Sequence, residues 1–424
     1  MSTGPDGVIS LVLAIGAFAA VLAASAALGH DPTIKAVSGF WFQSDAFRVL
    51  EDMDDFSANH FRDVHPLFTS MAMPIVLAIK FITGLDALHA VGIFNAIVAA
   101  LWVLLLYRIQ RRVGSAPLDA CLFAVLAAST SAAMFWFTVP ETYPLGSLAI
   151  LFCIWLAVRP AGAKCAGALL AIANVFSFGV TVTNVMAGLA ATFTQGSVKY
   201  AIKICCYSAA LFVIAFAAQK IILPRPPGIF VKALHLETRY VLTPEQGGPG
   251  ASALGMLAHS IVMPAVSIGT QGTKAGNFTI QDASLLRSGP IAVAALALWT
   301  AVLLAGCAAL IRSKRNSRLR LVLGLTLAGQ FALHLIYGEE TFLYALNVAP
   351  LLVLAASLSS TTPWRRPALA AAALLVVLLA VNNSGRLIET ATLVPISDNL
   401  PRQKLRVEKL GPGYYVPPAD STRK

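Results

Sequence analysis

The chain has 424 residues, of which 57% are hydrophobic and only 12% are charged. A soluble core cannot take up that much apolar surface, so the composition excludes a soluble globular protein and indicates a polytopic membrane protein. The formal net charge is +11, but the basic residues occur in short clusters between apolar runs. That pattern is typical of cytoplasmic loops and argues against nucleic acid as a partner.

Apolar runs of membrane-spanning length follow one another along the chain. The first, residues 8–29, lacks the basic n-region of a cleaved signal peptide, so we expect a retained helix. A second run, 66–83, follows the polar stretch FRDVHP, and a third, 89–107, leads into a basic loop. Residues 165–198 predict a hairpin of two short helices that turns near TVTN (181–184). The other predicted crossings are 118–138, 142–158, 203–223, 288–311, 319–337, 341–358 and a last run before residue 382.

Short basic loops mark the cytoplasmic side of a membrane protein. All of them must lie on one side, so an even number of crossings separates each neighbouring pair. The first helix starts inside, and 89–107 returns the chain to the inside, so 66–83 is predicted not to cross. We expect it on the outer face, as a re-entrant or interfacial helix, and expect the same of 253–269. The basic loops are 107–114, 159–164, 199–203, 312–320 and 363–367.

The predicted fold class is therefore an all-α, polytopic transmembrane bundle with about eleven crossings and interfacial or re-entrant helices on its outer face. We expect a membrane domain over residues 1–381, with a cytoplasmic N-terminus and large outer segments at 30–88 and 224–287. The C-terminal tail, 382–424, is expected outside the membrane, and the parity of the crossings places it on the outer side.

Acidic residues gather in the predicted outer segments. Asp45 and Asp52 are seven residues apart and share one face if their segment is helical, with Arg48 between them as a plain structural partner. Glu141 lies in TVPETYPLG, and Glu339 and Glu340 lie in YGEET. Ionisable groups near membrane depth are costly and mark pathways or sites. The alternative is that these carboxylates are ordinary solvated loop residues.

Cations lie in the same outer segments. Arginine presents a planar fork that suits phosphate, which makes Arg62, Arg225 and Arg239 candidates for binding a phosphorylated ligand. Lipid headgroups are an alternative partner for these side chains. His65 directly precedes Pro66 and could instead cap the following helix. The sequence contains no Gly-rich phosphate loop, HExxH motif or GxSxG elbow.

The order of these pieces resembles the GT-C superfamily of integral-membrane glycosyltransferases. That superfamily includes the protein O-mannosyltransferases, the lipid A aminoarabinose transferases and the catalytic subunits of oligosaccharyltransferases. The resemblance covers residues 8–200, and the later half matches loosely through GEETFLYALNVAPLLVL. The matching pieces are FQSDAFRVLEDMDD, DVHPLF, LYRIQRR and VPETYPLG.

The resemblance implies an inverting transfer of a sugar from a polyprenyl-phosphate donor to a glycan, lipid or protein acceptor. It places the reaction on the periplasmic face of a bacterial inner membrane. Asp45 is then the first choice for the base, with Asp52 as the alternative, and Glu141 orients Asp45 or helps to hold a cation. A divalent cation is possible, although no metal ligands are assigned. The remaining candidates for binding substrate or phosphate are Arg62, His65, Arg225, Arg239, Glu339, Glu340 and Asn184.

Other functions fit part of the pattern. A transporter or flippase of a lipid-linked sugar is one, although matching halves and broken helices are not visible in the sequence. An O-antigen polymerase or ligase is another, and would depend on basic outer residues such as Arg239 rather than on Asp45. A polytopic assembly factor without catalysis is the third. The sequence lacks a WWD-type motif and a large soluble C-terminal domain, so sequon-directed oligosaccharide transfer is not expected.

Overall fold

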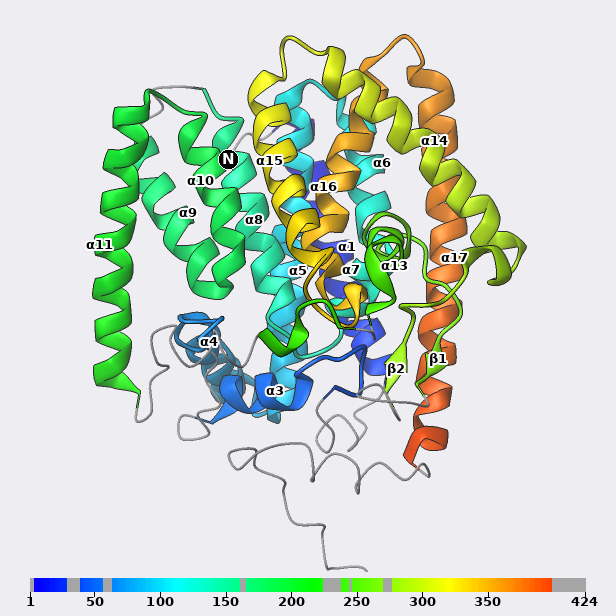
Figure 1. Cartoon of the computed structure of the whole chain (residues 1–424), viewed down its shortest axis with the longest axis horizontal. Coiled ribbons are helices and arrows are strands. Elements are labelled where there is room, and N and C mark those ends of the chain that lie inside the picture. The colour runs from blue at the N-terminus through cyan, green and yellow to red at the C-terminus, as the bar shows by residue number, and fades with distance from the viewer. Residues whose placement is uncertain are drawn as a thin grey trace, which may run out of the picture.

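The computed structural model describes residues 4–28, 39–55, 63–160, 165–223, 238–243, 246–269 and 277–398. Within them the chain is an all-α bundle of helices that run side by side, with only one two-stranded sheet (Figure 1). The helices of the bundle are α1 (Pro5–Leu28), α5 (Ala87–Val113), α6 (Pro117–Ala128), α7 (Ser131–Trp136), α8 (Tyr143–Ala157), α9 (Ala166–Val180), α10 (Val185–Phe193), α11 (Val198–Ile222), α14 (Pro290–Arg312), α15 (Ser317–His334), α16 (Ala345–Ser357) and α17 (Arg365–Asp398).

The predicted crossings correspond to these helices in chain order. The run predicted over 118–138 is divided into α6 and α7, and the predicted hairpin is α9 and α10, joined by a 3₁₀ turn at Val182–Asn184. Because a helix rises 1.5 Å per residue, α9 and α10 are short for a 30 Å bilayer. Six helices in the described part of the chain are long and apolar enough to cross a membrane. The fold is thus a multi-pass membrane bundle, while a total of eleven crossings stays a prediction.

The basic loops meet at one end of the bundle. The guanidinium groups of Arg112, at the end of α5, and Arg159, after α8, lie 4.8 Å and 4.9 Å from the ring centre of Trp155. Arg318, in the first turn of α15, donates to the carbonyl oxygen of Arg159 (3.2 Å). Three loops that are far apart in the sequence therefore share one surface.

The other two basic loops lie at the same end. Arg365, at the start of α17, forms a two-pronged ion pair with Asp119 in the first turn of α6, with distances of 2.6 and 2.7 Å. The first turn of α11, which carries Lys199, also lies at this end, the upper one in Figure 1. The prediction that all five basic loops lie on one side of the bundle is confirmed.

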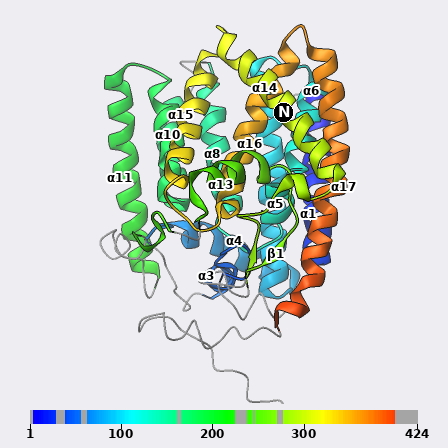
Figure 2. The same cartoon turned by 45° about the vertical axis from the view of Figure 1, so that its right-hand side comes forward.

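The segment from Asp63 to Thr83 lies at the opposite end. Helix α4 (Phe68–Thr83) packs beside α3 (Ala46–Asp54) at the lower end of the bundle in both views (Figures 1 and 2). Its last turn exposes Phe81 and Ile82, which are 91% and 79% accessible. Large apolar side chains that face outward at a bundle end are typical of an interfacial helix, so the placement of α4 agrees with the parity of the charges.

The second segment that was predicted not to cross, 253–269, is mostly buried between Gly255 and Val266. It consists of α13 (Gly248–Leu254), a π-helical turn (Gly255–His259) and an irregular stretch before β1 (Ser267–Ile268), which pairs antiparallel with β2 (Phe278–Thr279). Ile261 is fully buried, and its carbonyl oxygen accepts from the backbone N–H of Ser131 (3.0 Å) and from Nδ2 of Asn383 (2.9 Å). Irregular backbone is tolerated at this depth because protein groups satisfy it.

Helix α17 continues past the expected end of the membrane domain. It runs without a break through residue 382 to Asp398. Nδ2 of Asn382 donates to the carbonyl oxygen of Met263 (2.9 Å), and the N–H of Met263 donates to Oδ1 of Asn383 (2.9 Å). The proposed boundary at 382 therefore falls where the helix is attached to the core, and residues 399–424 lie outside the described part.

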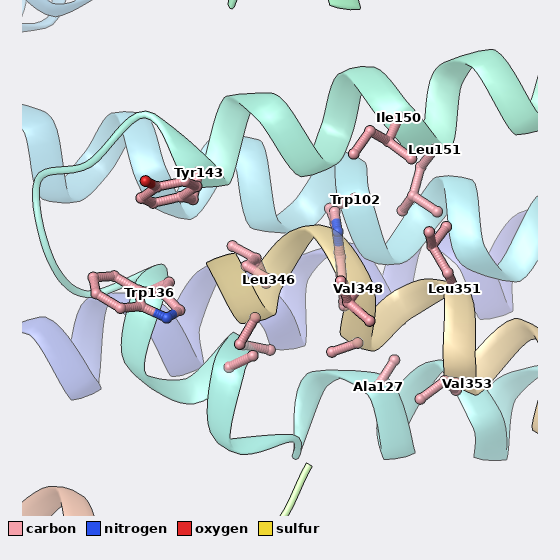
Figure 3. Close-up of a cluster of buried hydrophobic side chains, with 14 of the residues drawn as sticks. Trp102, Ala127, Trp136, Tyr143, Ile150, Leu151, Leu346, Val348, Leu351 and Val353 are labelled. Atoms are coloured by element: carbon pink, nitrogen blue, oxygen red, sulfur yellow. The ribbon is translucent and has the colours of Figure 1, made fainter. Parts of the chain in front are cut away.

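Three helices are connected by hydrogen bonds in the core next to the cavity described below. Nε1 of Trp102 on α5 donates to Oγ of Ser147 on α8 (2.8 Å), and Ser147 donates to the carbonyl oxygen of Leu346 on α16 (2.6 Å). Figure 3 shows α8 and α16 facing each other across Leu346, Ile150 and Leu351. These bonds fix the relative positions of α5, α8 and α16.

A close approach between α14 and α16 leads to the first prediction. A Cβ atom on Gly306 would lie 2.3 Å from the carbonyl oxygen of Ala355 and 2.4 Å from the Cα of Ala356. We expect Gly306→Ala to separate the two helices and to destabilise the protein by about 1–3 kcal/mol, the usual cost of overpacking. Thermal unfolding in detergent measures this. Gly324→Ala on α15 is the matched control, because a Cβ there meets nothing within 4 Å. A Gly306→Ala midpoint equal to that of the control would contradict the prediction.

Candidate active site

A cavity of about 380 Å³ opens near α3 and the segment before α4, at the end of the bundle away from the basic loops. Six separate segments line it, and four of the predicted site residues are among them: Asp45, His65, Glu339 and Glu340. Carboxylates from segments almost 300 residues apart in the sequence therefore share one cavity. The lining segments are 43–45, 64–65, 143, 181–183, 238–241 and 333–347.

Asp45 is held from two sides. It is the N-cap residue of α3, and its backbone N–H donates to Oε1 of Glu141 (2.7 Å). Its Oδ2 lies 3.0 Å from Nη2 of Arg48, and its side chain is 21% exposed. The carboxylate is thus anchored by its backbone and paired at one oxygen while it lines the cavity.

A buried aromatic turn precedes Asp45. Phe42 and Gln43 have φ angles of 49° and 66°, in the left-handed region that non-glycine residues rarely adopt. The ring of Phe42 is fully buried, with ring centres 4.9 Å from Phe135 and 5.0 Å from Phe342. Strained backbone persists where the surrounding packing determines it, so this aromatic cluster fixes the direction in which the chain enters α3.

Asp52 lies behind Asp45 on the same helix face. Its Oδ2 accepts from Nη1 of Arg48 (3.1 Å), so Arg48 bridges both aspartates as the sequence spacing predicted. Asp52 is only 3% exposed, and it is not among the described residues that line the cavity. Of this pair, Asp45 is the one that opens onto the cavity.

Glu141 is buried beside Asp45 in the loop between α7 and α8. Its Oε1 accepts the N–H of Asp45, and its Oε2 accepts the N–H of Thr142 (2.8 Å). Burial and the nearby charge of Asp45 raise the pKa of Glu141 to about 7, although both N–H donors and the charge of Arg48 act in the opposite direction. Glu141 positions the backbone of Asp45.

His65 connects the segment before α4 to the α9–α10 hairpin. Its Nδ1 lies 2.8 Å from the carbonyl oxygen of Val180 and 3.2 Å from Oγ1 of Thr181, and its ring lines the cavity. The helix starts at Phe68, later than Pro66, and its N-cap residue, Leu67, makes no side-chain cap hydrogen bond. The alternative that His65 caps this helix is therefore wrong.

Two further carboxylates line the cavity from the loop between α15 and α16. Glu339 is 7% exposed and Glu340 is 1% exposed. Oε2 of Glu340 accepts from Oγ1 of Thr279 (2.5 Å), next to the small sheet. The loop is thereby attached to β2, and both carboxylates are held at the cavity wall.

Aromatic rings form another part of the wall. Tyr344 stacks on His334 with ring centres 3.9 Å apart, and its edge meets Tyr143 at 5.7 Å. Tyr240 and Tyr337 pack together at 6.2 Å. Tyrosine combines an apolar face with a polar tip, so this wall suits a ligand that has both apolar and hydroxyl surfaces.

Arg239 lies at the rim of the cavity. Its guanidinium lies 4.6 Å from the ring centre of Tyr240, and Nη2 donates to the Tyr240 hydroxyl (2.7 Å). Tyr240 lines the cavity, and its carbonyl oxygen accepts from the N–H of Gly338 (2.9 Å). The segment that carries Arg239 is thus attached to the same loop as the two glutamates.

The remaining predicted residues lie deeper or outside the described part. Asn184 is fully buried next to the lining residue Thr183, and its Oδ1 accepts from Nε2 of Gln330 (3.3 Å). Arg62 and Arg225 lie outside the described residues. Within the described ranges, no group of three or more His, Cys, Asp or Glu side chains is arranged to hold a metal ion.

Several lining residues were not among the predicted candidates. Two of them, His334 and Asn347, lie in apolar helices, where polar side chains usually face the interior or a site. That rule, applied to α15 and α16, points to His334 and Asn347. Tyr143 follows Glu141 by two residues and could have been found by proximity. The polar and aromatic lining residues that were missed are Gln43, Tyr143, Thr181, Thr183, Thr238, Tyr240, His334, Tyr337, Tyr344 and Asn347.

Comparisons with known proteins give one structural match. The sequence matches no family model and no curated protein. The chain is similar to a solved structure described as the S. cerevisiae protein O-mannosyltransferase Pmt1-Pmt2 complex bound to the sugar donor, with 14% identity and a TM-score of 0.37. The match covers 66% of this chain and 41% of that one, so this chain spans less than half of its neighbour's length.

Proposed function

We propose that the chain is a membrane glycosyltransferase that transfers a sugar from a polyprenyl-phosphate-linked donor to a hydroxyl of an acceptor. The observation that carries this proposal is the setting of Asp45. Its carboxylate opens into a 380 Å³ cavity, while Glu141 holds its backbone and Arg48 balances its charge. A positioned carboxylate in a tyrosine-lined cavity suits general-base catalysis on a hydroxyl substrate.

The proposed reaction is a single inverting displacement. Asp45 takes the proton of the acceptor hydroxyl as that oxygen attacks the anomeric carbon of the donor sugar. The bond between the anomeric carbon and the phosphate oxygen breaks, and polyprenyl phosphate leaves with the electron pair. Negative charge grows on the phosphate during this step, so a nearby cation lowers the barrier. We assign this role to Arg239, whose guanidinium lies against the ring of Tyr240, a residue that lines the cavity.

The proposed location is the outer face of a bacterial inner membrane, with the N-terminus in the cytoplasm. It is supported by the separation of the basic loops from the cavity, because positive loops stay on the cytoplasmic side. On this arrangement Asp45 faces the periplasm, where the acceptor glycan, lipid or protein would be found.

A turnover measurement tests the proposal. The purified protein in lipid nanodiscs is given a polyprenyl phosphate that carries a radiolabelled sugar, together with extracted envelope acceptors. We expect labelled acceptor and free polyprenyl phosphate to appear in equal amounts. In sealed vesicles, movement of the intact sugar lipid across the bilayer without release of polyprenyl phosphate would instead identify a flippase. The glycan profile of a deletion strain identifies the native product.

A second prediction concerns the cation at the rim. We expect Arg239→Ala to lower kcat/KM for transfer by about 10- to 100-fold, since it removes the charge proposed to face the leaving phosphate. Arg287→Ala is the matched control, because Arg287 is an exposed arginine of the same outer region that does not line the cavity. An unchanged kcat/KM in Arg239→Ala would remove this residue from the mechanism. Loss of activity in Arg239→Ala with full activity in Asp45→Asn would favour the O-antigen polymerase or ligase class.

A further inference from the structure

Three polar atoms converge on one spot above Gly146, one helical turn further into the bundle than Tyr143. A Cβ atom on Gly146 would lie 3.0 Å from Nδ2 of Asn184, 3.5 Å from Oδ1 of Asn347 and 3.7 Å from Oγ1 of Thr181. These atoms come from the start of α10, from α16 and from the end of α9. The absence of a side chain on Gly146 leaves the space between them open.

Two of these atoms are buried without a hydrogen-bond partner. Asn184 is fully buried and Asn347 is 2% exposed. Neither Nδ2 of Asn184 nor Oδ1 of Asn347 has a hydrogen-bond partner. Asn347 and Thr181 also line the cavity. A buried polar atom without a partner costs about 1–3 kcal/mol of stability. Here an amide N–H donor and an amide C=O acceptor lie beside the same gap. This arrangement points to a ligand group that hydrogen-bonds to both.

The chemistry of that group follows from the two atoms. A hydroxyl accepts one hydrogen bond and donates another, so it satisfies an amide N–H and an amide C=O at the same time. A carboxylate only accepts, and an ammonium only donates, so each would leave one of the two asparagine atoms unpaired. Both asparagines are neutral, and a charged group there would also be buried without an opposite charge.

Further into the bundle, the contact between α8 and α16 is closed and apolar, while the buried Gln330 of α15 lies beside the spot and donates to Asn184. Figure 3 shows Ile150 and Leu151 of α8 beyond Tyr143, facing Val348 and Leu351 of α16. Ile150, Leu151, Val348 and Leu351 are all fully buried. The polar spot above Gly146 is therefore the inner end of the cavity, not a passage through the bundle.

We propose that the inner end of the cavity is a subsite for an uncharged sugar ring, with Asn184 and Asn347 binding one of its hydroxyl groups over Gly146. This inference rests on the proposed function and specifies the group of the donor sugar that reaches this spot as a hydroxyl, as in a neutral hexose, rather than the amino group of an amino sugar or the carboxylate of a uronic acid. Asn184 and Asn347 are specificity residues in this proposal and take no part in the proton transfer at Asp45.

Binding of defined lipids tests the subsite without relying on turnover. The full-length protein in nanodiscs is titrated with one polyprenyl phosphate, either bare or carrying glucose, mannose, galactose, glucosamine or glucuronic acid. We expect at least one neutral hexose to tighten binding by about tenfold or more over the bare lipid, and the charged sugars to tighten it less. Asn347→Leu removes the acceptor, and Gly146→Ala fills the gap. We expect each variant to bind the hexose lipid about tenfold more weakly than the wild type. Neither should change the affinity for the bare lipid.

The outcomes separate this inference from the proposed function. Gly324→Ala, with open space around its Cβ, is the control for a glycine change and should bind like the wild type. If the bare and hexose lipids bind equally well, or if both variants weaken the two lipids alike, the subsite is overturned while the proposed function stands. If no polyprenyl lipid binds the wild type, the proposed function fails, and the subsite fails with it.

Discussion

Asp45→Asn is expected to lower the rate of sugar transfer by about 10²- to 10⁴-fold, the contribution typical of a general base. Asparagine has the shape of aspartate but cannot take a proton from the acceptor hydroxyl. The backbone bond from residue 45 to Glu141 is unaffected by this change, and Arg48 keeps Asp52 as a partner. The substitution therefore removes the chemistry and leaves the local structure in place.

Two measurements are needed to read this result. Turnover of a labelled sugar lipid reports the transfer rate, and the thermal midpoint in detergent reports folding. Asp54→Asn is the matched control, because Asp54 lies on the same helix and pairs with Lys80 of α4. We expect that control to retain near-normal turnover. An Asp45→Asn protein that folds and transfers sugar at the wild-type rate would remove Asp45 from the role of base.

The order of the segments and the position of the basic loops at one end of the bundle could be predicted from the sequence because both depend on local features. Each basic loop is visible in a few residues, and the requirement for an even number of crossings then assigns 66–83 to the outer face. The turn of the short hairpin near residue 181 was found in the same way, from the length of an apolar run. Such features need no knowledge of which helices touch.

Which residues line the cavity could be predicted only in part, because tertiary packing decides which side chains come together. Sequence spacing showed that Asp45 and Asp52 share a helix face with Arg48, but not which of them opens onto a cavity. That depends on Glu141, whose bond to Asp45 joins residues 96 positions apart. The contact of His65 with Val180 is equally remote in sequence, which is why a local capping role was the simpler interpretation.

Glu141 gives the second large expected effect, a dependence of transfer on pH. The pKa of Glu141 lies near 7 in the folded protein, against an ordinary value of 4.5. Its ionised form accepts the N–H groups of both Asp45 and Thr142. As the pH falls through about 7, one oxygen gains a proton and becomes a poorer acceptor, so the loop that positions Asp45 loosens. We expect kcat to fall on the acid side of pH 7.

Protonation of Glu141 is expected to slow transfer but to stabilise the folded protein. A carboxyl group whose pKa is raised on folding favours the folded state fully below pH 4.5, and this contribution is lost as the pH rises through 7. The difference corresponds to about 3 kcal/mol. The thermal midpoint of unfolding should therefore be higher at pH 5 than at pH 8 where Glu141 dominates the pH dependence of stability.

Glu141→Gln tests whether Glu141 is the group whose titration causes the pH dependence of transfer. Glutamine cannot ionise, so we expect kcat to be lowered at neutral pH and the acid limb near pH 7 to disappear, together with the matching change in thermal midpoint. Glu339→Gln is the control, because it removes another carboxylate of the cavity wall and keeps the bond between Glu141 and the backbone of Asp45. His65 also lines the cavity. A limb that persists in Glu141→Gln would assign the pH dependence to another group such as His65, and Glu141 would then be only a structural partner of Asp45.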